Sequence, residues 1–213
     1  MGNRLKYHCL KPSFSEEKLL ETQGYRFIAG IDEVGRGALM GPVMAAAVIL
    51  PQEIKTRWLD KVKDSKQLSS AVRGLLFEHI CETAVSVGIG SSPPRVIDAL
   101  GIVQATRLAM KSAVEQLVPQ PQYLLVDYLQ LPEVQIPQKG ITYGDSRCFS
   151  IACASIVAKV SRDRLMVALD LDYPGYGLAE HKGYGTKKHL ASLHIKGPCP
   201  IHRRSFRPIR KVI

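Results

Sequence analysis

The feature that most constrains this fold is the stretch FIAGIDEVGRG, which runs from Phe27 to Gly37. A short apolar run ends there in two adjacent carboxylates, Asp32 and Glu33, and a glycine turn follows at once. A second apolar run covers residues 43–50. Apolar runs of this length, bounded by glycine and proline, are typical of buried strands. The sequence therefore predicts a strand, an acidic strand end, a glycine turn and a second strand.

The glycine turn does not match the common phosphate-binding loops. Gly30 and Gly35 have the spacing of a P-loop, but Arg36-Gly37 stands where that motif requires Lys-Ser/Thr, and no G-x-G-x-x-G occurs. The two carboxylates would repel a phosphate unless a cation lay between them. The stretch thus favours a metal ion that meets a phosphate, while an acidic turn without any ligand is the alternative.

Charge is distributed unevenly along the chain of 213 residues. The net charge is +10, and residues 181–213 hold nine Lys or Arg and no acid. Such a basic cluster indicates a polyanionic partner, and a solvated basic tail is the alternative. A membrane surface is not favoured, because this segment contains Gly, Pro and His rather than an apolar helical face.

The five cysteines and the N-terminus argue for a reducing compartment. The cysteine number is odd and no C-x-x-C occurs, which argues against a disulfide framework or a zinc site. Residues 1–20 contain no long apolar core, and the longest apolar run, residues 42–51, is too short to cross a bilayer. We therefore expect a cytoplasmic protein that does not enter the membrane.

Strand and helix patterns alternate through the rest of the chain. We predict strands over residues 24–31, 43–50, 84–90, 123–127 and 135–143, and helices over 15–22, 69–82, 97–117, 149–169 and 186–193. This order indicates an α/β fold with a mixed sheet and a helical C-terminal part. Residues 1–23 form a lead-in, and residues 24–213 form one domain that includes the basic C-terminal region.

Two further carboxylates join the acidic pair in this scheme. Asp127 ends a predicted strand, and Asp145 lies in the turn that opens a predicted buried helix. In open α/β sheets such strand ends gather at one edge, where ligands bind. Four carboxylates there would bind protons or hold hard divalent cations such as Mg²⁺. The alternatives are that Asp127 caps a turn and that Asp145 caps the helix.

A resemblance to a known family covers most of the chain. The stretch GIDEVGRGALMGPV, from Gly30 to Val43, closely resembles the signature of the type 2 ribonuclease H family, bacterial ribonuclease HII. Six more motifs follow in the family's order, and together they are far more specific than any one of them: KDSKQLS (63–69), LVD (125–127), GDS (144–146), ASIVAKV (154–160), HKGYGT (181–186) and GPCPIHRRSF (197–206).

The resemblance implies a ribonuclease H-like fold with a five-stranded mixed sheet flanked by helices. It assigns Asp32, Glu33, Asp127 and Asp145 as ligands of Mg²⁺ or Mn²⁺. The turn Gly35-Arg36-Gly37 would sense the ribose 2′-hydroxyl, and Tyr184 would pack on the next sugar. We expect backbone phosphates to be held by Arg36, Lys66, Lys182 and the basic tail.

The implied activity is an endonuclease that hydrolyses the RNA strand of RNA–DNA hybrids. It would also nick on the 5′ side of ribonucleotides embedded in duplex DNA, leaving a 5′-phosphate. We expect a monomer. The alternatives are a junction resolvase-like nuclease, which would ignore the 2′-hydroxyl, and a non-catalytic nucleic-acid-binding module. The sequence departs from the family at Tyr128, where a glycine usually follows the third acid.

Overall fold

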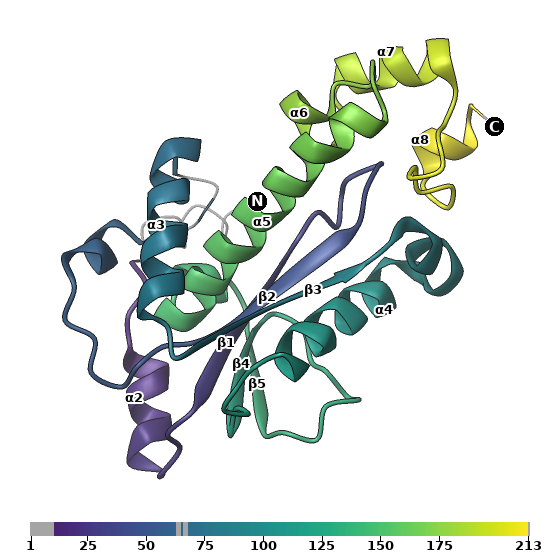
Figure 1. Ribbon diagram of the computed structural model, residues 1–213. Helices are drawn as coiled ribbons and strands as arrows, with labels where there is room; N and C mark the ends of the chain where they lie inside the picture. The colour runs from purple at the N-terminus through teal and green to yellow at the C-terminus, as the bar shows by residue number, and fades with distance from the viewer. Residues whose placement is uncertain (1–10, 63–64, 66–67, 213) are drawn as a thin grey trace, which may run out of the picture.

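A five-stranded mixed sheet forms the centre of the molecule (Figure 1). The computed structural model describes residues 11–62, 65 and 68–212. The strand order is β3-β2-β1-β4-β5, in which β1 pairs antiparallel with β2 and parallel with β4. The expected ribonuclease H-like sheet is thereby confirmed. The strands span β1 Ile28–Val34, β2 Val43–Ile49, β3 Ser86–Ser92, β4 Tyr123–Asp127 and β5 Gln138–Ile141.

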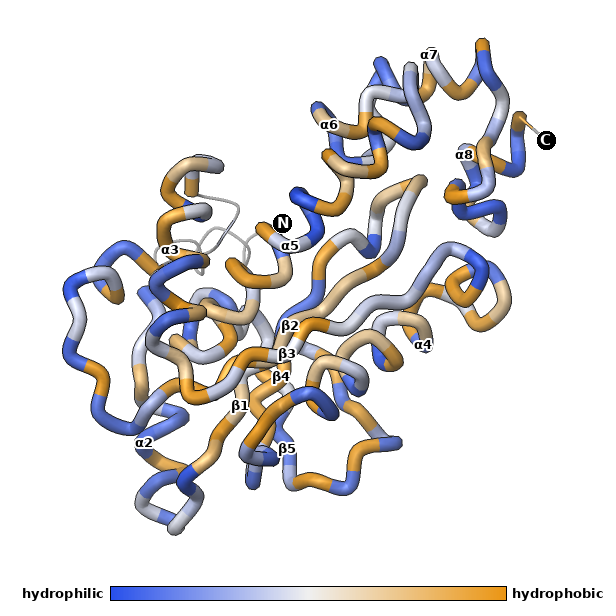
Figure 2. The backbone as a smooth tube through the Cα atoms, viewed as in Figure 1, coloured by the Kyte–Doolittle hydropathy of each residue, from blue (hydrophilic) through white to orange (hydrophobic). Residues whose placement is uncertain are grey.

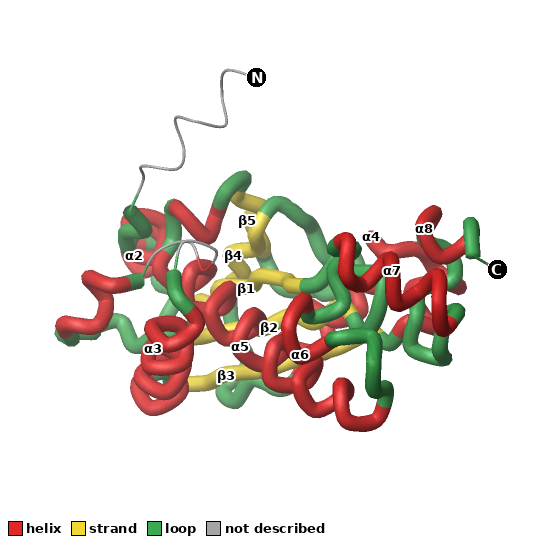
Figure 3. Tube along the Cα trace, turned by 90° about the horizontal axis from the view of Figure 1, so that it is seen from above, coloured by secondary structure: helices red, strands yellow, loops and turns green. Residues whose placement is uncertain are grey.

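Helices cover both faces of this sheet. The helices α3 and α5 lie over one face and α4 over the other, while α6, α7 and α8 gather at the far end of α5 (Figures 1 and 3). Two short 3₁₀ helices span Arg57–Lys61 and Gly144–Ser146. The α-helices span α2 Ser15–Thr22, α3 Ser70–Thr83, α4 Pro94–Glu115, α5 Phe149–Asp172, α6 Leu178–His181, α7 Lys187–Lys196 and α8 Arg207–Arg210.

The alternation of side chains along β2 divides the core into two layers. Ala46 and Val48 pack with residues of α3 and α5, whereas Ala45, Ala47 and Ile49 pack with residues of α4. A period of two is what places successive side chains of a strand on opposite faces. Because both faces are covered, β2 is apolar throughout, and hydrophobic colours gather on the central strands (Figure 2).

The start of α5 is fixed against β1 and against the N-terminal segment. A Cβ added to Gly30 would lie 2.1 Å from the carbonyl carbon of Ser150, so only glycine allows this close approach. The buried carboxylate of Glu17 in α2 accepts the Ser150 N–H at 3.0 Å and its hydroxyl at 2.7 Å. The first turn of α5 is therefore capped by a residue from another helix.

Several element boundaries differ from the sequence-based expectation, and those of β1 matter for the site. The strand β1 begins later and continues to Val34, so Asp32 and Glu33 lie inside it rather than beyond its end. The reason is that β2 runs on beside them and pairs them with Ala46 and Ala45. Within α4, Gly101 interrupts the helix with a φ of 79°.

Within the described part of the chain, no helix combines the length and the apolar character needed to cross a membrane.

Candidate active site

Three of the four acids meet at the point where β1 runs beside the end of β4. Asp32, Glu33 and Asp127 each offer one carboxylate oxygen, and these oxygens lie within 4.8 Å of one another. The pairing of Ile31 with Val126 aligns the two strands so that Asp32 and Asp127 are neighbours. The side chain of Asp32 is buried, with 5% of its surface exposed.

The fourth acid, Asp145, is also buried and lies in the 3₁₀ helix that precedes α5. Its charge contributes to the raised pKa of Asp32. The N-cap of α5 is Cys148, whose own side chain makes no capping hydrogen bond. The adjacent Gly144 N–H donates to the Asp127 carboxylate at 2.7 Å. This bond ties the turn that carries Asp145 to the end of β4.

The electrostatics of the cluster disfavour four free carboxylates. The pKa of Asp32 is well above its ordinary value, first because of burial and then because of the charges of Glu33, Asp127 and Asp145. A hydrogen bond from Ser155 opposes this shift of the pKa. Because the cluster offers only oxygen donors in a buried, negatively charged setting, it fits a hard divalent cation.

The glycine turn after β1 is shaped by a buried arginine. Gly35 has a φ of 86°, and a Cβ added there would lie 2.2 Å from the Arg162 Nε, whereas Gly37 faces open space. Arg36 extends back toward the acids and donates to Glu33 Oε1 at 3.1 Å. Of the two glycines in this turn, only Gly35 is therefore required by packing within the protein.

Two buried arginines hold the segment that follows this turn. Arg162 donates to the carbonyl oxygens of Pro42, Lys182 and Met40, at 3.0, 2.9 and 3.2 Å respectively. Arg203 donates to the carbonyl oxygens of Gly41 at 3.0 Å and Arg36 at 2.8 Å. Burial, then the charge of Arg162, lowers the pKa of Arg203 to about 9. Sequence analysis missed both roles, because the partners are backbone carbonyls.

The basic tail is accordingly not a free end. His202, Arg203 and Ile209 are buried, and the isolated bridge between Met40 and His202 ties the tail to the loop after β1. Because Arg203 is buried, it does not add to the basic surface. Exposed basic side chains of residues 181–213 are those of Lys187, Lys188, Lys196, Arg204, Arg207, Arg210 and Lys211.

An open cavity extends from the acids toward the C-terminal helices. A hollow of about 330 Å³ is lined by Glu33, Val34, Ser65, Ser155, Lys159 and Tyr184. A larger hollow of about 680 Å³ shares Lys159 and Tyr184 with it and is also lined by Arg73, Arg164 and Lys182. Of the predicted site residues, Tyr184 thus lines both hollows, Glu33 lines the smaller one and Lys182 lines the larger one.

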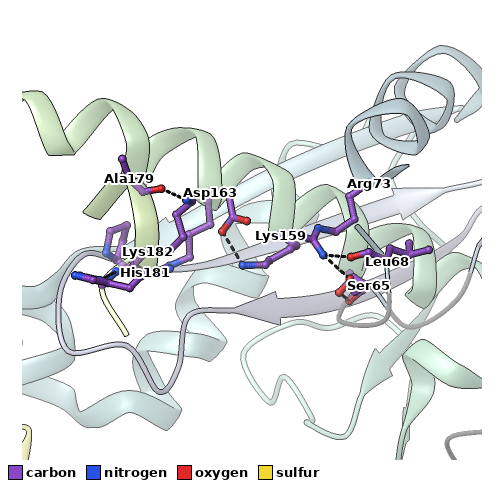
Figure 4. A network of polar contacts seen from close by, with 12 residues as sticks. Ser65, Leu68, Arg73, Lys159, Asp163, Ala179, His181 and Lys182 are labelled. Atoms are coloured by element: carbon purple, nitrogen blue, oxygen red, sulfur yellow. Dashed lines mark hydrogen bonds and ion pairs between the residues drawn. The ribbon is translucent and has the colours of Figure 1, made fainter. Parts of the chain in front are cut away.

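The polar residues of this hollow are held by local contacts (Figure 4). Lys159 forms an ion pair with Asp163 at 2.7 Å, and Lys182 Nζ donates to the Ala179 carbonyl. Arg73 donates to the carbonyl oxygens of Ser65 and Leu68 at 2.9 and 2.6 Å. The predicted phosphate contact Lys66 lies outside the described residues.

Two hydrogen-bonded histidines, His202 and His189, hold the backbone of Tyr184 in place. His202 Nδ1 accepts the Cys199 N–H at 2.9 Å, which leaves its proton on Nε2. This Nε2–H donates to His189 Nε2 at 3.2 Å, and His189 Nδ1–H donates to the Tyr184 carbonyl at 3.0 Å. This histidine chain requires neutral rings, and no sequence spacing had indicated it.

Comparisons with known proteins agree with one another. The family model described as ribonuclease HII matches residues 29–209. A ribonuclease HII of Dehalococcoides mccartyi is 59% identical over 95% of this chain and 95% of its own length. One from Geotalea uraniireducens is 52% identical over 95% of this chain and 93% of its own length.

Solved structures show the same fold. The ribonuclease H2 of Pyrococcus horikoshii OT3 superposes with a TM-score of 0.73 at 25% identity, covering 87% of this chain and 96% of that one. A Bst ribonuclease HIII solved in complex with Mn²⁺ has a TM-score of 0.65 at 18% identity, covering 100% of this chain and 73% of that one.

The two glycines of the turn provide a matched pair of substitutions. Gly35→Ala should lower the free energy of unfolding by at least about 1–2 kcal/mol, because its backbone is left-handed and the new Cβ meets Arg162. Gly37→Ala should change it by less than about 0.5 kcal/mol, because its Cβ enters open space. Urea unfolding of both variants tests this; equal effects would contradict the role of Arg162.

The histidine chain predicts a pH dependence of stability. Burial and the nearby His189 lower the pKa of His202 from 6.5 to about 4. As the pH falls, His202 is therefore protonated in the unfolded chain before it is protonated in the folded protein. The free energy of unfolding should fall by up to about 1.4 kcal/mol per pH unit as the pH drops from 6.5 toward 4. His202→Gln should show a flatter profile in urea unfolding at pH 7, 6 and 5. Parallel profiles for the two proteins would contradict a neutral His202.

Proposed function

The chain belongs to the ribonuclease HII family, and we propose that Asp32, Glu33, Asp127 and Asp145 are the catalytic centre of its endoribonuclease activity. The observation that carries this proposal is the meeting of three carboxylate oxygens within 4.8 Å around a buried Asp32. The substrates are the RNA strand of RNA–DNA hybrids and ribonucleotides embedded in duplex DNA. Such clustered acids destabilise a fold unless a cation offsets their charge.

We assign a divalent cation, Mg²⁺ or Mn²⁺, to the four acids. The Bst ribonuclease HIII, which shares the fold, was solved in complex with Mn²⁺. Such an ion supplies positive charge that makes water a stronger nucleophile and offsets charge on the leaving oxygen. The role of the chain's own residues is to hold the carboxylates in place. The Gly144 N–H fixes Asp127, and Ser155 bonds to Asp32.

Residues around the acids would position the nucleic acid. Backbone amides of Gly35 to Gly37 come one residue after the acidic pair, so they can reach a ribose 2′-hydroxyl beside the phosphate at the acids. Arg36 forms an ion pair with Glu33 at 3.1 Å and can neutralise that phosphate. Lys182 on the hollow and Lys66 would hold backbone phosphates, which position a duplex without reading its sequence. The 2′-hydroxyl is what separates RNA from DNA.

Tyr184 offers a flat ring in the lining of the smaller hollow, which Glu33 also lines. Its ring packs beside the Arg162 guanidinium, with 5.6 Å between the guanidinium carbon and the ring centroid. A ring packed on the sugar after the ribonucleotide accommodates a deoxyribose more easily than a ribose. This arrangement supports cleavage on the 5′ side of a lone ribonucleotide followed by DNA.

The remaining assignments concern the location and the oligomeric state of the protein. All four cysteines in the described part of the chain are free thiols, which agrees with a reducing cytoplasm. We propose a cytoplasmic monomer that acts on nucleic acid and not at a membrane. A junction resolvase-like activity or a non-catalytic binding role would be favoured only if cleavage did not depend on the 2′-hydroxyl or on the acids.

The first test removes one acid. Asp127→Asn should lower cleavage of a DNA duplex with one ribonucleotide by at least about 100-fold in Mg²⁺, because it weakens a cation ligand. Duplex affinity should stay within about twofold, since the basic surface is untouched. Initial rates and fluorescence anisotropy measure the two quantities, and the all-DNA duplex is the control. Cleavage within a few-fold of wild type would remove Asp127 from the catalytic centre.

The second test concerns the sugar after the ribonucleotide. Tyr184→Ala should lower the initial rate at a lone ribonucleotide by more than about tenfold, with a smaller loss on a continuous RNA–DNA hybrid. Tyr184→Phe keeps the ring and should retain most of the wild-type ratio of the two rates. If the ratio is the same in all three proteins while each is folded, Tyr184 has no part in selecting the junction.

A further inference from the structure

Two tyrosines with an unusual backbone stand beside the acids. Tyr128, the residue after Asp127, has a φ of 59°, and Tyr143, two residues before Asp145, has a φ of 57°. Left-handed backbone is uncommon for any residue with a side chain and is normally occupied by glycine or asparagine. The third described residue of this kind is Lys182, which lines the larger hollow, whereas the two that stand beside the acids are both aromatic.

The conformation of Tyr128 is imposed by a tight turn at the end of β4. The Leu129 N–H donates to the Asp127 carbonyl at 2.6 Å, which closes a three-residue turn around Tyr128. The Tyr128 N–H donates to the Ile141 carbonyl at 3.1 Å and joins this turn to β5. Both bonds fix the backbone of Tyr128 relative to the Asp127 carboxylate.

The residues after the turn are buried, but Tyr128 is not. Leu129 and Leu131 belong to the core beneath α4, and Gln138 accepts the Leu131 N–H at 2.7 Å. The side chain of Tyr128 is 67% exposed. The fold therefore gains little burial from the ring, while the ring's own backbone is one that glycine would adopt more easily. Packing alone does not account for a tyrosine here.

The ring of Tyr143 lies on the same rim of the site, which is formed by the turns that follow β4 and β5. The pairing of Asp127 with Ile141 places the ends of β4 and β5 side by side, so the turns that carry Tyr128 and Tyr143 are neighbours. Tyr143 is 39% exposed, and the Gly144 N–H that follows it donates to Asp127. This rim lies on the β4 side of β1, whereas the hollow lined by Tyr184 lies toward α3 and α5.

We propose that the Tyr128 ring packs on a base or sugar of the nucleic-acid substrate next to the cleaved bond, with Tyr143 as its neighbour on the rim. The inference rests on the proposed catalytic role of Asp127. A strand that brings a phosphate to Asp127 passes within reach of the next residue, because consecutive Cα atoms are only about 3.8 Å apart. Exposed aromatic rings stack on bases of any sequence, which suits an enzyme that selects the sugar and not the base.

The test separates the ring from the backbone. Tyr128→Asn removes the ring and keeps a residue that tolerates left-handed backbone, whereas Tyr128→Phe keeps the ring. Duplex affinity measured by anisotropy in EDTA excludes any contribution from divalent ions. We expect Tyr128→Asn to weaken binding about five- to tenfold. Tyr128→Phe should stay within twofold of wild type, and the unfolding midpoint of Tyr128→Asn should not fall.

A matched control and two opposing outcomes complete the test. Leu171→Ala removes another exposed apolar side chain, at the end of α5, and should leave affinity unchanged. Equal affinity of wild type and Tyr128→Asn would overturn the inference, as would an equal loss in Tyr128→Phe. If Asp127→Asn still cleaves normally, the proposed catalytic centre fails instead, so the two failures are distinguishable.

Discussion

The burial of Asp32 among three other carboxylates is the constraint on which the rest of this structure depends. Like charges in a buried setting oppose folding, and the raised pKa of Asp32 is the direct sign of that opposition. The surrounding contacts hold the acids together nonetheless: the β1–β4 pairing aligns Asp32 with Asp127, and the Gly144 N–H fixes the Asp127 side chain. The folded protein thus keeps an unfavourable cluster of carboxylates, and a divalent cation would reduce the repulsion among them.

Buried arginines and neutral histidines support the part of the site that lies beyond the acids, through hydrogen bonds that end on backbone carbonyls. Arg162 and Arg203 hold the loop after β1, and the His202–His189 pair holds the carbonyl of Tyr184. These groups need not touch substrate to matter, because they fix the positions of Arg36 and Tyr184 relative to the acids. The C-terminal segment is thus part of the framework of the site as well as a source of exposed charge.

The sequence predicted the sheet, most helices and the gathering of Asp32, Glu33 and Asp127, because apolar periodicity and the family's motifs are local signals. It misplaced the end of β1, since the extension of that strand depends on β2 running beside Asp32 and Glu33. It could not separate the buried Arg203 from the exposed arginines near it, because the acceptors are carbonyls of residues more than 160 positions away. The left-handed turn at Tyr128 was equally hidden, although the unusual residue there was visible.

Thermal unfolding of the metal-free protein with and without Mn²⁺ tests the central claim most directly. If the four acids hold a cation that relieves their repulsion, Mn²⁺ should raise the unfolding midpoint of the wild-type protein by several degrees. The rise should be much smaller in Asp32→Asn, whose metal-free form should also unfold at a higher temperature than the metal-free wild type, because one buried charge is gone. An absent rise in the wild type, or an equal rise in both proteins, would contradict the account.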